Sequence, residues 1–451
     1  MYVITNYVER ITVNINKKKE TMSFTKYITL ILCVASIAIA HDHSSLFDKC
    51  AVTGCVASEP SANIKDHGDN NTKNIGVWLQ PTFRDFSADE SGMTGFFPGH
   101  EGERPEKQGL GVDHTEFYWS ATKADQLRGS AVIAIAEHDG ETEVKFEEAY
   151  IETLNSYLLP EGMNVKFGRA FWTLGSLNAQ LCHSDNFADR PLPYRAFLDK
   201  AFNDDGLEVS YRLPVDFYAV VGAGNFRGND FPFGLGEEAE AGNEGKSGYI
   251  RVGSTLTEDS SWRAGAYMLS GNVGSRQTGH THDGESETFT FSGESDLYVY
   301  DLRYSYKGLV LSGEYFSRTE TGDLNIVVDE GNGAPENDTF GLNDIETSGW
   351  YVSAVYELNS KMRLGVRYSK LGSPDYSSSA NNDPAVVGAD ALLSTAHEGE
   401  FNAGGYDPVA LAYMVDWNHS DNSLIRFQVN KEELSNGNED DQFIVQYIMN
   451  L

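Results

Sequence analysis

Residues 182–198 hold the densest group of side chains that could carry chemistry. Cys182, His183 and Asp185 lie close together, and thiolate and imidazole groups are common zinc ligands. No clear fourth ligand follows, so a second interpretation stands beside the zinc site: charged side chains of this segment could set an electric field in a pore, or form salt bridges that fix a loop. The residues for that interpretation are Asp185, Asp189, Arg190 and Arg195.

A second set of candidates consists of arginines on alternating segments. Alternation in a strand sends successive side chains to opposite faces, and these arginines fall on the polar face. If that face lines a pore, they would form a basic ladder opposite acidic loop residues. Cross-strand pairing without selectivity is the alternative. The arginines are Arg251, Arg303, Arg363 and Arg367.

Near the N-terminus, His41 and His43 could bind metal loosely, although a flexible polar leader explains them as well. Cys50 and Cys55 flank a short loop and could form a disulfide in an oxidising compartment.

Enzyme signatures find no support in this chain. It contains neither a G-x-S-x-G elbow nor an H-E-x-x-H helix, and no phosphate-binding glycine loop. We therefore expect no catalytic residues. An acyl hydrolase is the weaker alternative, because β-barrel lipases usually have fewer strands than the sixteen that this sequence predicts below.

The composition favours a β protein without nucleic-acid binding. Of 451 residues, 23 are Tyr, 24 Phe and 44 Gly, and aromatic residues favour strands while glycine favours turns. The net charge is −33, whereas nucleic-acid binders are basic. The chain has only 4 Cys, which is too few for a fold held together by disulfides. The acidic surface could attract cations, or could simply be solvated.

The N-terminal region resembles a secretory signal. Lys26 precedes an apolar run over residues 28–40 that ends in small residues. About 13 residues are too few for a spanning helix, which needs roughly 20. We expect a signal peptide over 1–40 with Met22 as the start, a mature chain from His41, a flexible polar periplasmic leader over 41–73, and a barrel over 74–451.

Alternating segments recur from residue 74 to the end. In the last one, Phe443, Val445 and Tyr447 alternate with Gln442 and Gln446, so one face is apolar and the other mostly polar. Residues 142–154 alternate less well, which suggests a bulge. The sixteen expected strands are 74–86, 111–121, 127–137, 142–154, 163–171, 205–213, 217–226, 246–257, 262–272, 295–306, 308–320, 346–357, 361–371, 405–418, 423–433 and 441–451.

The connections between these segments alternate in length. Short links such as 124–126 and 214–216 take turns with long ones. A transmembrane β-barrel requires this alternation, with short periplasmic turns and long outer loops, and sixteen strands leave an aqueous channel. The expected long connections are 87–110, 172–204, 227–245, 273–294, 321–345 and 373–404.

The pattern over residues 74–451 resembles the bacterial outer-membrane porin superfamily. In porins, the third outer loop folds into the lumen and narrows it. Here that connection is 172–204, and its apolar residues need a surface to bury against. A loop packed on itself outside the barrel is the alternative. The apolar residues include Leu174, Leu177, Leu181, Phe187, Leu192, Tyr194, Phe197 and Leu198.

The stretch 166–198 also resembles uncharacterised outer-membrane proteins described as zinc-regulated or TonB-linked receptors. The matching positions are Gly168-Arg169, Gly175 to Asn178, Phe187, Asp189 and Pro191 to Leu198. Those proteins carry a His-x-His pair; here His183 is present, but Leu181 replaces its partner.

Together these features predict an all-β, sixteen-strand antiparallel barrel in the bacterial outer membrane. It would contact lipid and lipopolysaccharide and let small hydrophilic solutes or ions diffuse passively. The porin resemblance implies a homotrimer. A metal (zinc)-linked receptor with a loop-closed barrel and a soluble β-sandwich are the alternatives. No resident cofactor is expected, although zinc at the third loop or calcium at acidic loops would fit the residue types.

Overall fold

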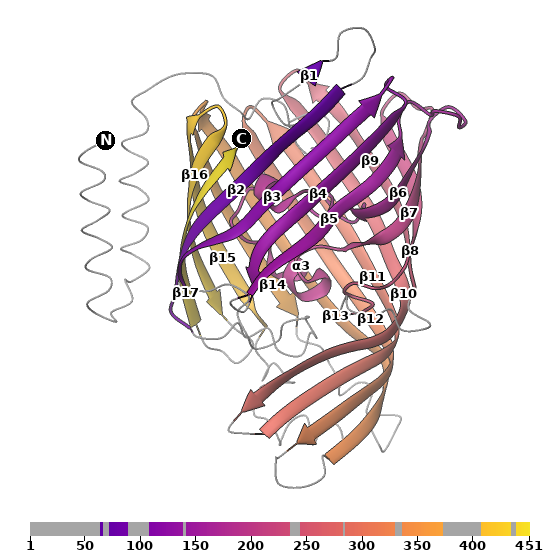
Figure 1. The fold of residues 1–451 in the computed structure, drawn as a ribbon, viewed down its shortest axis with the longest axis vertical. Coiled ribbons are helices and arrows are strands. Elements are labelled where there is room, and N and C mark those ends of the chain that lie inside the picture. The colour runs from indigo at the N-terminus through magenta and orange to yellow at the C-terminus, as the bar shows by residue number, and fades with distance from the viewer. Residues whose placement is uncertain are drawn as a thin grey trace, which may run out of the picture.

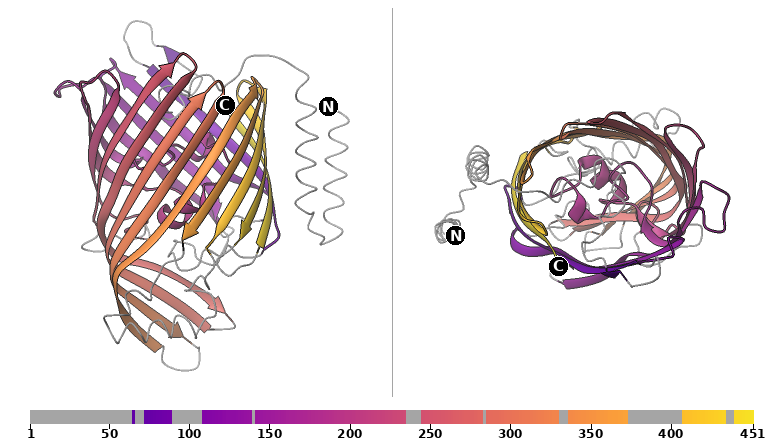
Figure 2. Two further views of the ribbon diagram at one scale, coloured as in Figure 1. Left: turned by 180° about the vertical axis from the view of Figure 1, so that it is seen from behind. Right: turned by 90° about the horizontal axis from the view of Figure 1, so that it is seen from above.

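One sheet closed into a ring dominates the part of the chain that the structure describes. The computed structural model describes residues 64–65, 72–88, 108–138, 141–234, 244–282, 285–329, 336–372, 407–433 and 439–451. The sheet has 17 strands, one of which is the two-residue β1 (Ile64–Lys65). The other sixteen pair antiparallel in chain order, and β17 closes the ring against β2 with Val445 opposite Phe83. Figures 1 and 2 show the resulting barrel.

The described strands agree with the expected ones in number and order, which confirms the predicted fold class and rules out two packed sheets. Their bounds are β2 Thr72–Phe86, β3 Gly109–Lys123, β4 Leu127–His138, β5 Glu141–Thr153, β6 Met163–Phe171, β7 Asn203–Arg212, β8 Tyr218–Phe226, β9 Glu244–Thr257, β10 Ser260–His282, β11 Glu285–Tyr306, β12 Leu309–Asp329, β13 Glu336–Asn359, β14 Met362–Gly372, β15 Val409–Ser420, β16 Ser423–Glu433 and β17 Glu439–Asn450.

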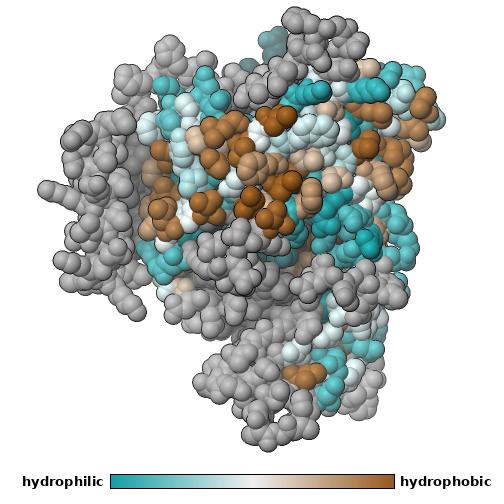
Figure 3. Space-filling view, viewed as in Figure 1, coloured by the Kyte–Doolittle hydropathy of each residue, from teal (hydrophilic) through white to brown (hydrophobic). Residues whose placement is uncertain are grey.

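The two faces of the barrel wall differ in polarity. Outward positions such as Phe117, Tyr300 and Trp350 are exposed, although they are large and apolar. On the face seen in Figure 3, which carries β2–β5, apolar residues gather in a band between more hydrophilic zones. A closed ring satisfies every backbone group, and an apolar belt suits lipid, so this is the architecture of a bacterial outer-membrane barrel. No helix in the described part of the chain has the length and apolarity to cross a membrane.

The prediction of two long loops is wrong, because the structure has strands there. Residues 273–294 and 321–345 were predicted as long connections, yet most of them extend β10–β13 into strands of 21 to 24 residues. The extensions project beyond the rim of the barrel (Figure 1) and pair only with each other, for example Thr278 with Phe289. Because no lipid contacts them there, their outer face needs no apolar alternation, and the sequence pattern that marks a membrane strand is missing.

The start of the barrel also differs slightly from expectation. β2 begins at Thr72, and the expected leader contributes β1, which pairs with Thr72 and Lys73. The bulge expected in 142–154 is confirmed, because Glu147 has no partner between Phe146 and Glu148 on β5. The signal segment 1–40 lies outside the described residues.

The connection from β6 to β7 lies inside the barrel. We call residues 172–202 the inner loop. It contains the short helices η1 (Cys182–Ser184) and α3 (Leu192–Leu198), which Figure 2 shows within the ring when seen from above. Pro191 starts α3 in extended conformation, and Asp199 ends it in the left-handed region. The loop therefore lies within the ring, while its role as a third outer loop that constricts a pore stays a prediction.

Candidate functional site: the inner loop and the lumen

The first anchor of the inner loop is a buried carboxylate of the wall. Glu314 on β12 accepts hydrogen bonds from the Ser176 hydroxyl at 2.5 Å and the Tyr194 hydroxyl at 3.0 Å, both from the loop. Tyr351 on β13 donates a third at 2.6 Å. Glu314 is 3% exposed, so these donors rather than water satisfy its carboxyl oxygens. Burial, followed by the Glu314 charge, raises the pKa of the Tyr194 hydroxyl well above its ordinary value, which keeps that group a donor.

The second anchor joins the loop to neighbouring strands of the wall, β14 and β16. Arg367 on β14 donates to the Asp189 carboxylate at 3.0 Å and to its backbone carbonyl at 2.6 Å. Gln428 and Asn430 on β16 donate to the same carboxylate. Burial alone would raise the pKa of Asp189, but the Arg367 and Arg195 guanidiniums outweigh it and hold the pKa below its ordinary value.

Two further arginines make contacts in this region. Arg195 of α3 donates to Glu432 on β16 at 2.7 Å. Arg363 on β14 donates to Asn186 of the loop at 3.0 Å and to Asp416 on β15 at 2.5 Å. These contacts fix the loop to one continuous part of the wall, from β12 to β16.

Within the loop, Arg190 ties its turns together. Its guanidinium donates to Asp185 at 2.8 Å and to the backbone carbonyls of Gln180 and Lys200. Burial raises the pKa of the Asp185 carboxyl, and the adjacent Arg190 guanidinium opposes part of this rise. Both side chains are buried, so they brace the loop.

Apolar packing joins the inner loop to a large part of the wall. Trp172, Tyr194 and Phe197 belong to one cluster with wall residues such as Phe316 and Leu371. Phe197 and Phe316 stack at a centroid distance of 6.0 Å. Such burial stabilises the folded state by roughly 25 cal/mol for each Å² of apolar surface removed from water. The apolar residues that were noted in the sequence thus find a buried surface inside the barrel.

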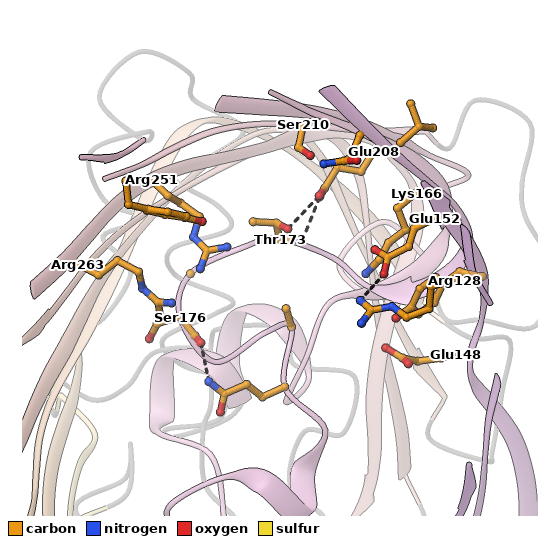
Figure 4. A pocket seen from close by; sticks show the side chains of 17 residues that line it. Arg128, Glu148, Glu152, Lys166, Thr173, Ser176, Glu208, Ser210, Arg251 and Arg263 are labelled. Atoms are coloured by element: carbon orange, nitrogen blue, oxygen red, sulfur yellow. Dashed lines mark hydrogen bonds and ion pairs between the residues drawn. The ribbon is translucent and has the colours of Figure 1, made fainter. Parts of the chain in front are cut away.

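Beside the loop lies a polar cavity of about 230 Å³. It is bounded by loop residues such as Thr173 and Ser176 and by inward side chains of β4–β10. Figure 4 shows Arg251 and Arg263 at one side of it and Glu148 at the other. Its charged lining consists of Arg128, Lys166, Arg251, Arg263, Glu148, Glu152 and Glu208.

The candidate pore residues fall into two groups. Arg251 lines the cavity, and Arg303 shares the inward face because it pairs with the cavity residue Arg263. Arg363 and Arg367 also face inward, but they hold the ion pairs described above. The same is true of Asp185, Asp189, Arg190 and Arg195, whose contacts match the salt-bridge interpretation; their effect on permeation stays a prediction.

Of the metal candidates, the structure describes the side chains of His183 and Asp185, and each has another partner. His183 contacts Glu116 on β3, with Nδ1 at 2.9 Å from Oε2, and stacks on Trp78 at 4.0 Å. The side chain of Cys182 and the residues His41, His43, Cys50 and Cys55 lie outside the described part of the structure, so these predictions stay open.

Sequence reasoning missed the wall residues that hold the loop and line the cavity. Glu314, Lys166 and Arg263 each occupy a polar position of an expected strand, so the alternation marked them as inward. Nothing in the sequence could show which inward residues lie opposite the loop, because that depends on strand tilt and loop path.

The comparisons with known proteins agree with this architecture. No family model matches the chain. An uncharacterised protein of Aquifex aeolicus is 31% identical over 287 residues, which is 60% of this chain; the chain spans 56% of that protein. A form of OmpT, an outer membrane protein of Vibrio cholerae, lacking loop L8 is similar in structure, with a TM-score of 0.50, 13% identity, and coverage of 85% of this chain and 100% of OmpT.

A second similar structure is an anion-selective porin from Comamonas acidovorans. Its TM-score is 0.50 and its identity 12%, and the match covers 85% of this chain and 100% of the porin. The chain has the fold of a bacterial outer-membrane porin. The likeness at this identity concerns the fold, and the narrower resemblance to zinc-regulated receptors stays a prediction.

Proposed function

We propose that the protein is a porin-like channel through which small hydrophilic solutes or ions cross the outer membrane by passive diffusion. One observation carries this proposal: a sixteen-strand ring holds a polar, charge-lined cavity beside an anchored inner loop. Barrels of this size are wide enough for an aqueous channel. Solutes pass between the inner loop and β4–β10, where the charge-lined cavity lies.

The charges of this cavity support selection by field as well as by size. Arg251 and Arg263 lie across the cavity from Glu148 (Figure 4). Arg128 pairs with Glu152, so that pair contributes little net charge. A solute entering this space crosses a transverse field, which favours small dipolar or ionic solutes over apolar ones.

Planar-bilayer recording of the purified full chain tests the proposal. Stable open conductance steps are expected at neutral pH. A silent protein that inserts correctly would instead favour the receptor with a loop-closed barrel. Insertion is checked separately by protection of the membrane strands from protease.

A homotrimer is part of the proposal. The exposed aromatic and aliphatic side chains of the outer wall provide apolar surface for contact between copies as well as with lipid. Chemical cross-linking in native membranes should give a trimer band, and a monomer at all cross-linker concentrations would contradict it.

A further inference from the structure

A group of ligand-type side chains lies on the inner wall at the edge of the inner loop. His114 and Glu116 are two positions apart on β3, so both face the lumen. Glu147 comes from β5. Each residue offers one ligand atom, and these three atoms all lie within 4.8 Å of one another. None of these residues was a metal candidate in the sequence.

The bulge in β5 brings Glu147 into this group. Glu148 pairs with Val132 and Phe146 with Ile133, so Glu147 is the extra residue between them. A bulge changes the direction of a side chain, and bulges are frequent beside functional sites. Ala134 on the intervening strand lies opposite Glu116, and its small side chain leaves space between β3 and β5.

The spacing of the three side chains fits a small divalent ion. His114 Nε2 lies 3.0 Å from Glu116 Oε1 and 3.3 Å from Glu147 Oε1. Metal–ligand bonds of about 2.0–2.2 Å in a tetrahedral zinc site separate neighbouring ligand atoms by roughly 3.3–3.6 Å. Small side-chain shifts would therefore admit an ion, and solvent would fill the fourth position.

The charges of the group also call for a cation. The side chain of Glu116 is fully buried, and that of Glu147 is 16% exposed. Two carboxylates this close need a positive charge between them, which either a protonated imidazole or a metal ion supplies. The imidazole ligand favours a transition metal such as Zn²⁺ over Ca²⁺ or Mg²⁺.

His183 connects this group to the inner loop. Its Nδ1 lies 2.9 Å from Glu116 Oε2, the carboxylate oxygen that does not face His114. Its ring stacks on Trp78 at 4.0 Å and 16°. Polar partners of metal-binding carboxylates orient them and strengthen binding.

We propose that His114, Glu116 and Glu147 bind one divalent transition-metal ion, and that His183 is a positioning residue through which this ion holds the inner loop against β3. Bound metal would stiffen the loop at this edge of the lumen without blocking the cavity between the loop and β4–β10.

Zinc titration of the chelator-treated full chain in detergent, by calorimetry and by Co²⁺ absorption, tests the site. One ion per chain is expected above any binding by the leader histidines. Glu147→Gln and His114→Gln should abolish that site. The controls His41→Ala/His43→Ala and His419→Ala should retain it. Equal binding by wild type and by correctly folded E147Q or H114Q, or no binding by wild type, would overturn the proposal.

The coupling to the loop needs a readout of its own. Zn²⁺ should slow hydrogen exchange of residues 172–202 in wild type. His183→Ala should weaken zinc binding by roughly 10- to 100-fold and remove the slowing even at saturating zinc. If H183A keeps both wild-type affinity and the slowing, the proposed role of His183 is wrong. Heat-dependent gel mobility verifies that each variant is a folded barrel.

Discussion

The Tyr194 hydroxyl of the inner loop lies 3.0 Å from the buried carboxylate of Glu314 on β12. These residues are far apart in the chain, and their contact joins the loop to the wall at a point where water is excluded. The contact also explains Gly175, at which an added Cβ would lie 2.2 Å from the Glu314 carboxylate and 2.6 Å from the Tyr194 hydroxyl.

Glu314→Ala should release this side of the loop. Buried hydroxyls of Tyr194 and Tyr351 would lose their acceptor, at about 1–3 kcal/mol for each group. We expect a lower midpoint of thermal unfolding and larger, noisier conductance steps. Glu314→Gln keeps an acceptor and should lie between E314A and wild type. Wild-type conductance and unfolding in E314A would show that the contact does not hold the loop.

Gly175→Ala should have a similar but smaller effect. Gly175 has a φ of +68°, which costs a residue with a Cβ about 1–3 kcal/mol in strain, and the Cβ would displace Glu314. Gly248→Ala is the matched control, since nothing lies within 4 Å of its added Cβ. The midpoints of thermal unfolding of the two variants test this prediction. Equal midpoints for G175A and G248A would contradict it.

The anchor at Asp189 should resist moderate acid. Its pKa is lowered in the folded protein, so the anchor contributes stability above the ordinary aspartate pKa of about 3.9 and loses it as the pH falls through the lower folded value. Conductance steps should therefore stay stable from neutral pH to about pH 4 and become noisy only below it. The conductance steps of the Asp189→Asn variant should be noisy already at neutral pH. A wild-type transition to noise well above pH 4 would count against this anchor.

Removing cavity arginines should change ion selectivity. Arg251→Ala with Arg263→Ala takes two positive charges from the lining of the cavity. The reversal potential in a tenfold salt gradient should shift toward cation preference, within the limit of ~59 mV per decade. Lys307→Ala, an exposed charge in the turn between β11 and β12, is the control. An unchanged reversal potential in the double variant would place the solute path elsewhere.

Arg363→Ala should act on stability rather than on selectivity. Breaking a buried ion pair costs about 3–5 kcal/mol, but Asp416 also accepts from Arg426 at 2.8 Å, so we expect the lower end of that range. The unfolding midpoint should fall while the reversal potential stays near wild type. A selectivity change as large as that of R251A/R263A would return Arg363 to the pore-lining residues.

The sequence by itself determined the ring and its polarity. Alternation with a period of two marked each membrane strand, because lipid outside and water inside impose opposite requirements on successive residues. The same rule placed Arg251 and Glu314 on the inner face. It failed for residues 273–294 and 321–345, since no lipid constrains the outer face of β10–β13 beyond the rim.

The tertiary structure alone decided what the inward side chains do. Arg251 and Arg367 look alike in sequence, yet one lines the cavity and the other binds Asp189. The path of the inner loop makes this difference, and that path depends on contacts between residues more than a hundred positions apart. His114, Glu116 and Glu147 likewise meet only because two strands and a bulge align them across the curved wall.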